Sequence, residues 1–418
     1  MNKQPARMNL AFIYVTSLFF AWGFVTATID PLVPLVKSVF TLTYSESLLT
    51  QFAFFMSYGI VSLPASSLVA RRGSASSIVI ALITMVVGCL IIPVATAARA
   101  YPLVLVALFV IGSGITLLQV AANPLAAALG TPERSHMRLV LSQAFNSLGT
   151  TIAPFVGAKL LLSGGVFGGG AQDEAALAES LHKIDLASFV LAGAIALLAF
   201  GLWRVRAHLT TRSLDADARP HSPFEALKSR WAVAGAVGIF LYVGAEVSVG
   251  SLAINFLVNT LGIPFEDAGH LLSFYWGGAM VGRFIGSILL SRFRAGPLLT
   301  GVALIACALC AVVSQSGGNV AAVALLSIGL FNSIMFPTIF TLTLERSSAT
   351  PASTSGLLCM AIVGGALLPQ LVGKVADQVS LGLAFLVPSA AYLCIAVFAA
   401  ATSRKAPVAL AEAGRTLH

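Results

Sequence analysis

Long apolar stretches separated by short polar connections run through this chain from Leu10 to Ala401. Each stretch has about 20 mostly apolar residues, which is long enough for a helix to cross a hydrocarbon layer of about 30 Å. The pattern predicts twelve spans, at 9–36, 46–70, 74–97, 101–129, 137–163, 185–207, 231–260, 266–291, 296–314, 319–345, 352–376 and 381–402. We therefore expect an all-α integral membrane protein.

A polar connection at 208–230 separates the first six predicted spans from the last six. It carries several charged side chains and two prolines, and it has no apolar run long enough to span a membrane. We expect an N-terminal six-helix bundle at 1–207, a cytoplasmic linker at 208–230, and a C-terminal six-helix bundle at 231–418. The first stretch is too long for the apolar part of a signal peptide, so it is expected to remain as a helix.

Landmarks of the first half recur in the second half with a nearly constant offset. Pro124 recurs as Pro337, and Pro154 recurs as Pro369 at almost the same separation. Transporter halves are often related copies. A proline inside a membrane helix frees a backbone carbonyl, which is tolerated where protein or a water-filled path satisfies it. The sequence therefore predicts two pseudo-symmetric bundles with bent helices beside a central path.

Composition and charge agree with a membrane protein and argue against other classes. The chain is 58% hydrophobic and 10% charged, with a mean hydropathy of +0.93, whereas soluble domains are about 25% charged. The net charge of +8 is dispersed over many loops, so we expect no nucleic-acid partner. With alternate loops assigned to opposite sides, 19 of the 24 Lys and Arg residues fall on one side. The positive-inside rule places both termini in the cytoplasm.

Two acidic residues, Asp30 and Glu246, lie well inside predicted spans. A charge in mid-membrane costs at least about 2.5 kcal/mol, so such residues are usually functional and face the bundle interior. The repeat offset carries Asp30 to position 243, about one turn from Glu246. We predict that these acids couple transport to a cation, H⁺ or Na⁺. The alternative is a neutral carboxylic acid that hydrogen-bonds a neighbouring helix.

Uncharged hydrogen-bonding residues and aromatic residues accompany the two acids in the spans. Amides supply the donors and acceptors that a polyol needs, and aromatic faces suit a sugar ring, so we expect a small neutral sugar. The alternative for any single amide is a hydrogen bond that holds two helices together. The predicted substrate-binding residues are Gln119, Asn123, Gln143, Asn146, Asn255, Tyr275 and Trp276.

Arg283 is the one basic residue predicted to lie deep in a span, where a cytoplasmic-side gate or a helix-end contact would explain it. A strongly anionic substrate would require more fixed cations, so the sequence disfavours one. The five cysteines show no metal-like spacing, and no nucleophile, base and orienting group form a catalytic constellation. We expect neither a metal, nor a cofactor beyond the coupling ion, nor an enzymatic activity.

Several motifs resemble the fucose-galactose-glucose symporter family of the major facilitators. They are QVAANPLAAALG, RLVLSQAFNSLGT, YVGAEVSVGS, YWGGAMVGRFIGS, GLFNSIMFPTIFTLTLE and SGLLCMAIVGGALLPQLVG. The resemblance implies a major facilitator fold and a bacterial hexose transporter. We expect H⁺-coupled symport by a monomer in the inner membrane. The resemblance assigns Asp30 to the acid of the first helix, Gln143 and Asn146 to a sugar-binding pair, and Glu246 to the glucose and galactose branch.

One residue departs from the family pattern. The fucose-type branch has an acid just before its AANP run, where this chain has Gln119. The coupling scheme of that branch is therefore not carried over. Na⁺-coupled or uncoupled sugar transport, and proton-driven efflux of small organic compounds, remain alternatives to H⁺-coupled uptake.

Overall fold

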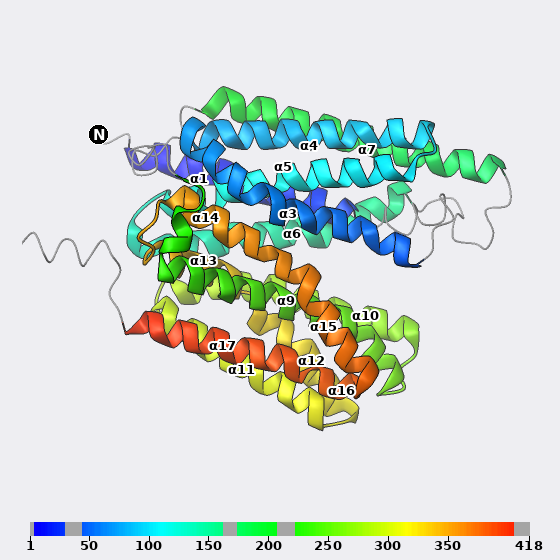
Figure 1. Cartoon of the computed structure of the whole chain (residues 1–418), viewed down its shortest axis with the longest axis vertical. Helices are drawn as coiled ribbons and strands as arrows, with labels where there is room; N and C mark the ends of the chain where they lie inside the picture. Colours follow the sequence, from blue (N-terminus) through cyan, green and yellow to red (C-terminus); the bar gives the residue numbers. More distant parts are fainter. Residues whose placement is uncertain (1–3, 30–43, 162–173, 207–221, 405–418) are drawn as a thin grey trace, which may run out of the picture. The chain divides into compact units, whose positions relative to one another are not determined.

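A computed structural model describes residues 4–29, 44–161, 174–206 and 222–404 (Figure 1). These residues are almost entirely helical and contain no β-strand. The helices of the first half are α1 (Gln4–Ile29), α3 (Tyr44–Arg72), α4 (Ser74–Ala97), α5 (Tyr101–Ala128), α6 (Ser135–Leu161) and α7 (Glu174–Val205). Those of the second half are α9 (Arg230–Asn259), α10 (Phe265–Leu290), α11 (Ala295–Gln315), α12 (Gly318–Asn332), α13 (Met335–Leu344), α14 (Pro351–Met360), α15 (Gly364–Gln378), α16 (Leu381–Ala384) and α17 (Leu386–Ser403).

Every predicted span coincides with a helix or with a pair of consecutive helices in the described part of the chain. Among these residues, nine helices are long and apolar enough to cross a membrane. The sixth helix begins at Glu174, because it continues through a polar stretch before the membrane. Its apolar, membrane-spanning part, Ile184–Val205, agrees with the predicted span. The expected end of the first span, beyond Ile29, lies outside the described residues.

The tenth, eleventh and twelfth spans are each divided into two helices. Ser333 and Ile334 separate α12 from α13, and a 3₁₀ turn at Ala361–Val363 separates α14 from α15. Pro337 explains the first break, because its missing N–H leaves the carbonyl of Ser333, four residues earlier, without a helical donor. Arg283 of α10 supplies one instead, through its Nε at 3.1 Å. The proline-bent helix predicted here is confirmed.

The described chain forms two compact units. In the first, which comprises 1–125 and 145–220, α4 packs along α7. In the second, which comprises 126–144 and 221–418, α11 packs against α12 and α17, and α9 packs against α15 and α17. The predicted linker at 208–230 lies mostly outside the described residues, so its role as the boundary stays a prediction.

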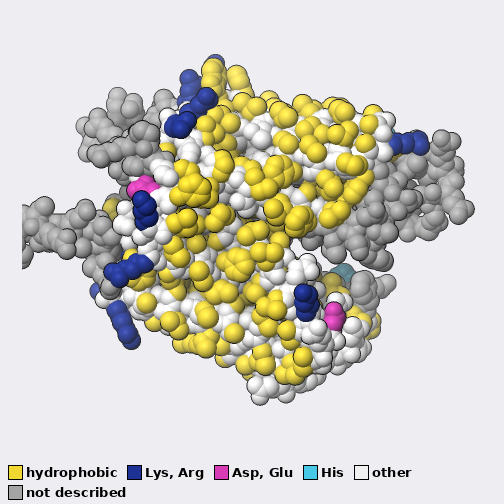
Figure 2. Space-filling view, viewed as in Figure 1, with side chains coloured by type: hydrophobic (Ala, Val, Ile, Leu, Met, Phe, Trp, Pro, Cys, Tyr) yellow, Lys and Arg dark blue, Asp and Glu magenta, His cyan; other side chains and the backbone are white. Residues whose placement is uncertain are grey.

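On the face shown in Figure 2, apolar side chains predominate between the ends of the helices, whereas Lys and Arg lie near those ends. Leu197 on α7, for example, is 74% exposed, and Ile13, Phe274 and Val397 are also exposed. An exposed apolar surface this extensive would favour association in water. It is the expected surface of a helical protein whose sides face lipid hydrocarbon.

Candidate functional site

A polar cluster forms around Glu246 in the second unit. Glu246 lies half-buried in the middle of α9, with Tyr242 one turn before it on the same helix. The Tyr242 hydroxyl and the Arg283 guanidinium of α10 both interact with its carboxyl group. An acid inside a membrane helix needs such partners, because the surrounding hydrocarbon offers none.

A second layer of hydrogen bonds fixes the backbone at Glu246. Tyr275 of α10 is fully buried, and its hydroxyl donates to the backbone oxygen of Glu246 at 3.2 Å. The same hydroxyl accepts from Nδ2 of the buried Asn332, at the end of α12, at 2.9 Å. Gly329 lets α12 approach, because any Cβ there would overlap the backbone oxygen of Tyr275. These contacts join α9, α10 and α12 at the depth of the acid.

The first unit contains a matching amide–tyrosine pair. Nε2 of Gln119 on α5 donates to the hydroxyl of Tyr58 on α3 at 2.6 Å, and both side chains are buried. Gln119 is separated from Asn332 by the same offset that separates Pro124 from Pro337 in the internal repeat. Each unit therefore contains an amide that donates to a tyrosine on a neighbouring helix, as related halves would.

The other predicted amides of the first half lie on α5 and α6. Nδ2 of Asn146 on α6 donates to the backbone oxygen of Phe19 on α1 at 3.1 Å. Gly23 allows this close approach, because a Cβ at that position would overlap the backbone of Asn146. Asn123 and Gln143 are buried on α5 and α6. Asn146 thus joins two helices, which was the alternative to ligand binding for such an amide.

Two predicted site residues, Trp276 and Asn255, are exposed, and a third, Asp30, lies outside the described residues. Trp276 is 46% exposed and meets Tyr275 edge to face, with ring centroids 5.0 Å apart. Asn255, farther along α9, is exposed. Asp30 lies outside the described residues, so its proximity to Glu246 stays a prediction.

Arg283 contacts a carbonyl at the end of a neighbouring helix, α12. Its Nε is bonded to the carbonyl that Pro337 leaves free, and its charge acts on Glu246. It therefore connects the break between α12 and α13 to the acid on α9. The predicted gating role stays a prediction, but the contact explains why an arginine is tolerated at this depth.

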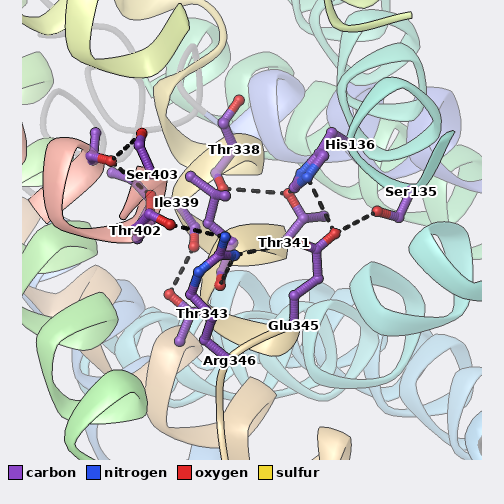
Figure 3. Close-up of polar contacts among 12 residues, drawn as sticks. Ser135, His136, Thr338, Ile339, Thr341, Thr343, Glu345, Arg346, Thr402 and Ser403 are labelled. Atoms are coloured by element: carbon purple, nitrogen blue, oxygen red, sulfur yellow. Dashed lines mark hydrogen bonds and ion pairs between the residues drawn. The ribbon is translucent and has the colours of Figure 1, made fainter. Parts of the chain in front are cut away.

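A second polar cluster lies where α13 ends and α6 begins (Figure 3). Ser135 Oγ and His136 Nε2 lie 3.0 and 3.1 Å from Oε1 of Glu345, and Arg346 lies 3.2 Å from Oε2. His136 Nδ1 also lies 2.6 Å from the hydroxyl of Thr341. The cluster therefore joins the first turn of α6 to the end of α13 within the second unit.

The Glu345 carboxyl is held ionised by these neighbours. Burial raises its pKa, but the hydrogen bond and charge of His136, together with Ser135 and Arg346, outweigh burial and hold the pKa below its usual value. Arg346 also donates to the backbone oxygen of Thr402 on α17 at 3.0 Å. The cluster thus extends to a third helix.

Sequence reasoning missed several residues of the two polar clusters. Tyr58 and Asn332 were not predicted as site residues, although the repeat offset applied to Gln119 points to position 332. Glu345 follows Glu133 by nearly the same offset, but nothing in the sequence names His136 as its partner. In the described residues, no three His, Cys, Asp or Glu side chains gather as metal ligands.

Comparison with known proteins gives one family over most of the chain. Residues 11–361 match the model of the Major Facilitator Superfamily. The chain is 44% identical to the glucose/galactose transporter of Brucella abortus, over 95% of both chains. It is 32% identical to the L-fucose-proton symporter of Escherichia coli, over 96% of this chain and 95% of that protein.

Solved structures agree with these relatives. The crystal structure of the E. coli fucose:proton symporter FucP superposes with a TM-score of 0.82 and 28% sequence identity. The superposition covers 95% of this chain and all of that one. The twelve-span prediction is therefore supported by an experimentally determined fold.

Proposed function

Because this chain belongs to the Major Facilitator Superfamily, and within it groups with glucose/galactose and L-fucose-proton transporters, we propose that it takes up a neutral hexose together with H⁺. It is a multi-pass membrane transporter and not an enzyme. The relatives that support the sugar and the proton match nearly the whole chain. Alternating access between the two halves would move both solutes across the membrane.

The half-buried carboxyl of Glu246 in the middle of α9 is the observation that supports proton coupling. Its interactions with Tyr242 and Arg283 suit a group that gains and loses a proton during the cycle. Without the proton, the positive charge of Arg283 offsets the cost of a carboxylate in a membrane helix. With the proton, the neutral acid can donate a hydrogen bond to a sugar hydroxyl. Asp30 is the proposed coupling acid of the first half.

The amides supply the polar surface for the sugar. A primary amide has two donors and an acceptor with two lone pairs, so one bond to a neighbouring helix does not use all of its capacity. Gln119 and Asn146 each donate once within the protein. We propose that these two bind the hexose together with Asn123, Gln143, Asn255, Tyr275 and Trp276.

The distribution of charge supports the cellular placement. With 19 of 24 basic residues expected on one side, we infer that both termini are cytoplasmic and that the protein resides, as a monomer, in a bacterial inner membrane. Uptake driven by the inward proton gradient would then proceed from the opposite side to the cytoplasm.

The test compares two transport modes in proteoliposomes that contain the full chain. Labelled glucose, galactose and fucose are measured in counterflow, which needs no gradient, and in uptake driven by an imposed proton gradient. Glu246→Gln and Asp30→Asn should keep counterflow and lose gradient-driven accumulation, because sugar binding survives while proton binding does not. Asp267→Asn, at an exposed position early in α10, is the matched control and should keep both.

The outcomes distinguish the parts of the proposal. Absence of counterflow for all three sugars in the wild type would refute a hexose substrate. Normal accumulation in both acid variants would refute their role in coupling. If accumulation is lost when K⁺ replaces Na⁺ at fixed pH, the coupling ion is Na⁺ and not H⁺.

A further inference from the structure

An apolar cavity lies between α1, α4 and α7 in the first unit. Its volume is about 210 Å³, and all twelve side chains that line it are apolar or aromatic. Trp22 of α1 together with Leu82 and Met85 of α4 forms the inner end, where these side chains are buried. Val190 and Ala194 of α7 form the outer end and are exposed.

The cavity opens toward the hydrocarbon layer. Leu82 and Met85 lie near the middle of α4, and Val190 and Ala194 lie in the middle part of the apolar segment Ile184–Val205 of α7. The exposed face of α7 around this opening is also apolar, including Phe189 and Leu197. A molecule that reaches the opening therefore arrives through the bilayer interior and not from water.

The chemistry of the lining restricts the occupant. Apolar cavities of about 150 Å³ stay dry and bind small hydrocarbons such as benzene, and an empty cavity loses dispersion contacts on every wall. The abundant mobile hydrocarbon at this depth is the acyl chain of a lipid. We propose that a lipid acyl chain enters past the exposed side chains of Val190 and Ala194 and occupies this cavity as far as Trp22.

The bound chain would support α1 on a different face from the one that meets α6. On the α6 side, Gly23 and Gly149 bring the two backbones into direct contact, because a Cβ at either position would overlap the other helix. On the cavity side, the side chains of Phe20 and Trp22 form part of the cavity wall. The acyl chain therefore fills the space beside a helix whose other face is fixed by close backbone packing.

Fluorescence of Trp22 tests the proposal in the full chain. The other three tryptophans are replaced by Trp203→Phe, Trp231→Phe and Trp276→Phe, and the protein is reconstituted in phosphatidylcholine brominated in mid-chain. Trp22 is only 8% exposed, so a chain inside the cavity should quench it more strongly than lipid that stays outside the opening. We expect quenching comparable to that of Leu197→Trp in a Trp-free background, because that position faces lipid at a similar depth.

A matched pair of variants tests the route of entry. Ala194→Phe fills the opening and should abolish quenching of Trp22, whereas Ala196→Phe, at an exposed position on the same helix outside the cavity lining, should leave it unchanged. Unquenched Trp22 in the parent protein overturns the proposal, whether the cavity is empty or a second copy covers it. Equal quenching in the two variants also overturns it.

Discussion

Substitution of Glu345 measures how much the polar cluster at the start of α6 contributes to the stability of the fold. The Glu345 carboxylate accepts from Ser135 at 3.0 Å and from His136 at 3.1 Å through Oε1, and lies 3.2 Å from Arg346 through Oε2. A hydrogen bond to a charged group contributes about 1.5–3 kcal/mol when buried. The Glu345 side chain is 25% exposed, so solvent reduces each contribution.

Glu345→Gln should therefore lower the free energy of unfolding by about 1–3 kcal/mol in total. The glutamine keeps one acceptor oxygen but presents an NH₂ group to either Arg346 or the α6 donors. For a unit of this size, about 2–4 °C of melting temperature corresponds to 1 kcal/mol. The expected decrease is on the order of 5 °C, measured in detergent at pH 7 by intrinsic tryptophan fluorescence.

The effect should also depend on pH in a defined direction. Because the pKa of Glu345 is lowered in the folded protein from an ordinary value of 4.5, its contribution is complete above that ordinary value. It is lost as pH falls through the lowered value. The difference between wild type and Glu345→Gln should be present above about pH 4.5 and should shrink as the pH falls below that value.

A nearby acid provides the control for this experiment. Glu133→Gln removes the same charge from an exposed position just before Ser135, and it should change the melting temperature by less than about 1 °C. Equal effects of the two substitutions at pH 7 would refute the reasoning. A difference that persists unchanged at pH 3.5 would show that ionisation of Glu345 is not its source.

Three further predictions use the same thermal measurement. Gly329→Ala should lower the free energy of unfolding by about 1–3 kcal/mol, because the added Cβ overlaps the Tyr275 backbone oxygen. Gly301→Ala, which has no atom within 4 Å of the added Cβ, should instead raise it by about 0.5–1 kcal/mol. Equal effects of the two substitutions would contradict the close packing at Gly329. Tyr275→Phe should lower the free energy of unfolding by about 1–3 kcal/mol, because Asn332 loses its hydroxyl acceptor. In that variant, the further substitution Asn332→Leu should destabilise the protein less than it does in the wild type. Arg138→Lys should lower the free energy of unfolding by about 1–2 kcal/mol. The guanidinium donates to three carbonyls at and beyond the end of α5, and one ammonium cannot replace all three contacts. An unchanged melting temperature would contradict this.

The lengths and places of the helices could be predicted from the sequence because hydrocarbon selects for apolar length. The span predicted at 74–97 has the same limits as α4, and that at 231–260 differs from α9 by one residue at each end. Hydropathy also marks the membrane-spanning part of α7, Ile184–Val205, but not the polar first turns of the same helix from Glu174. The break near Pro337 followed from proline geometry.

The candidate site was only partly predictable. The cost of burying a charge singled out Glu246, and the repeat offset relates Gln119 to Asn332. The partners of these residues depend on how each helix is rotated and how closely it approaches its neighbour. Apolar content on nearly every face of a membrane helix leaves that rotation almost unspecified.

The sequence by itself therefore determined the number of spans, the buried acid in α9 and the resemblance to sugar symporters, since each depends on local composition or on contiguous motifs. Tertiary structure alone decided that Tyr275 connects Glu246 to Asn332, that Arg283 binds the carbonyl freed by Pro337, and that His136 meets Glu345. These contacts join residues from different helices, at distances set by glycines and by side-chain packing. That information lies in the assembled helices and not in any one of them.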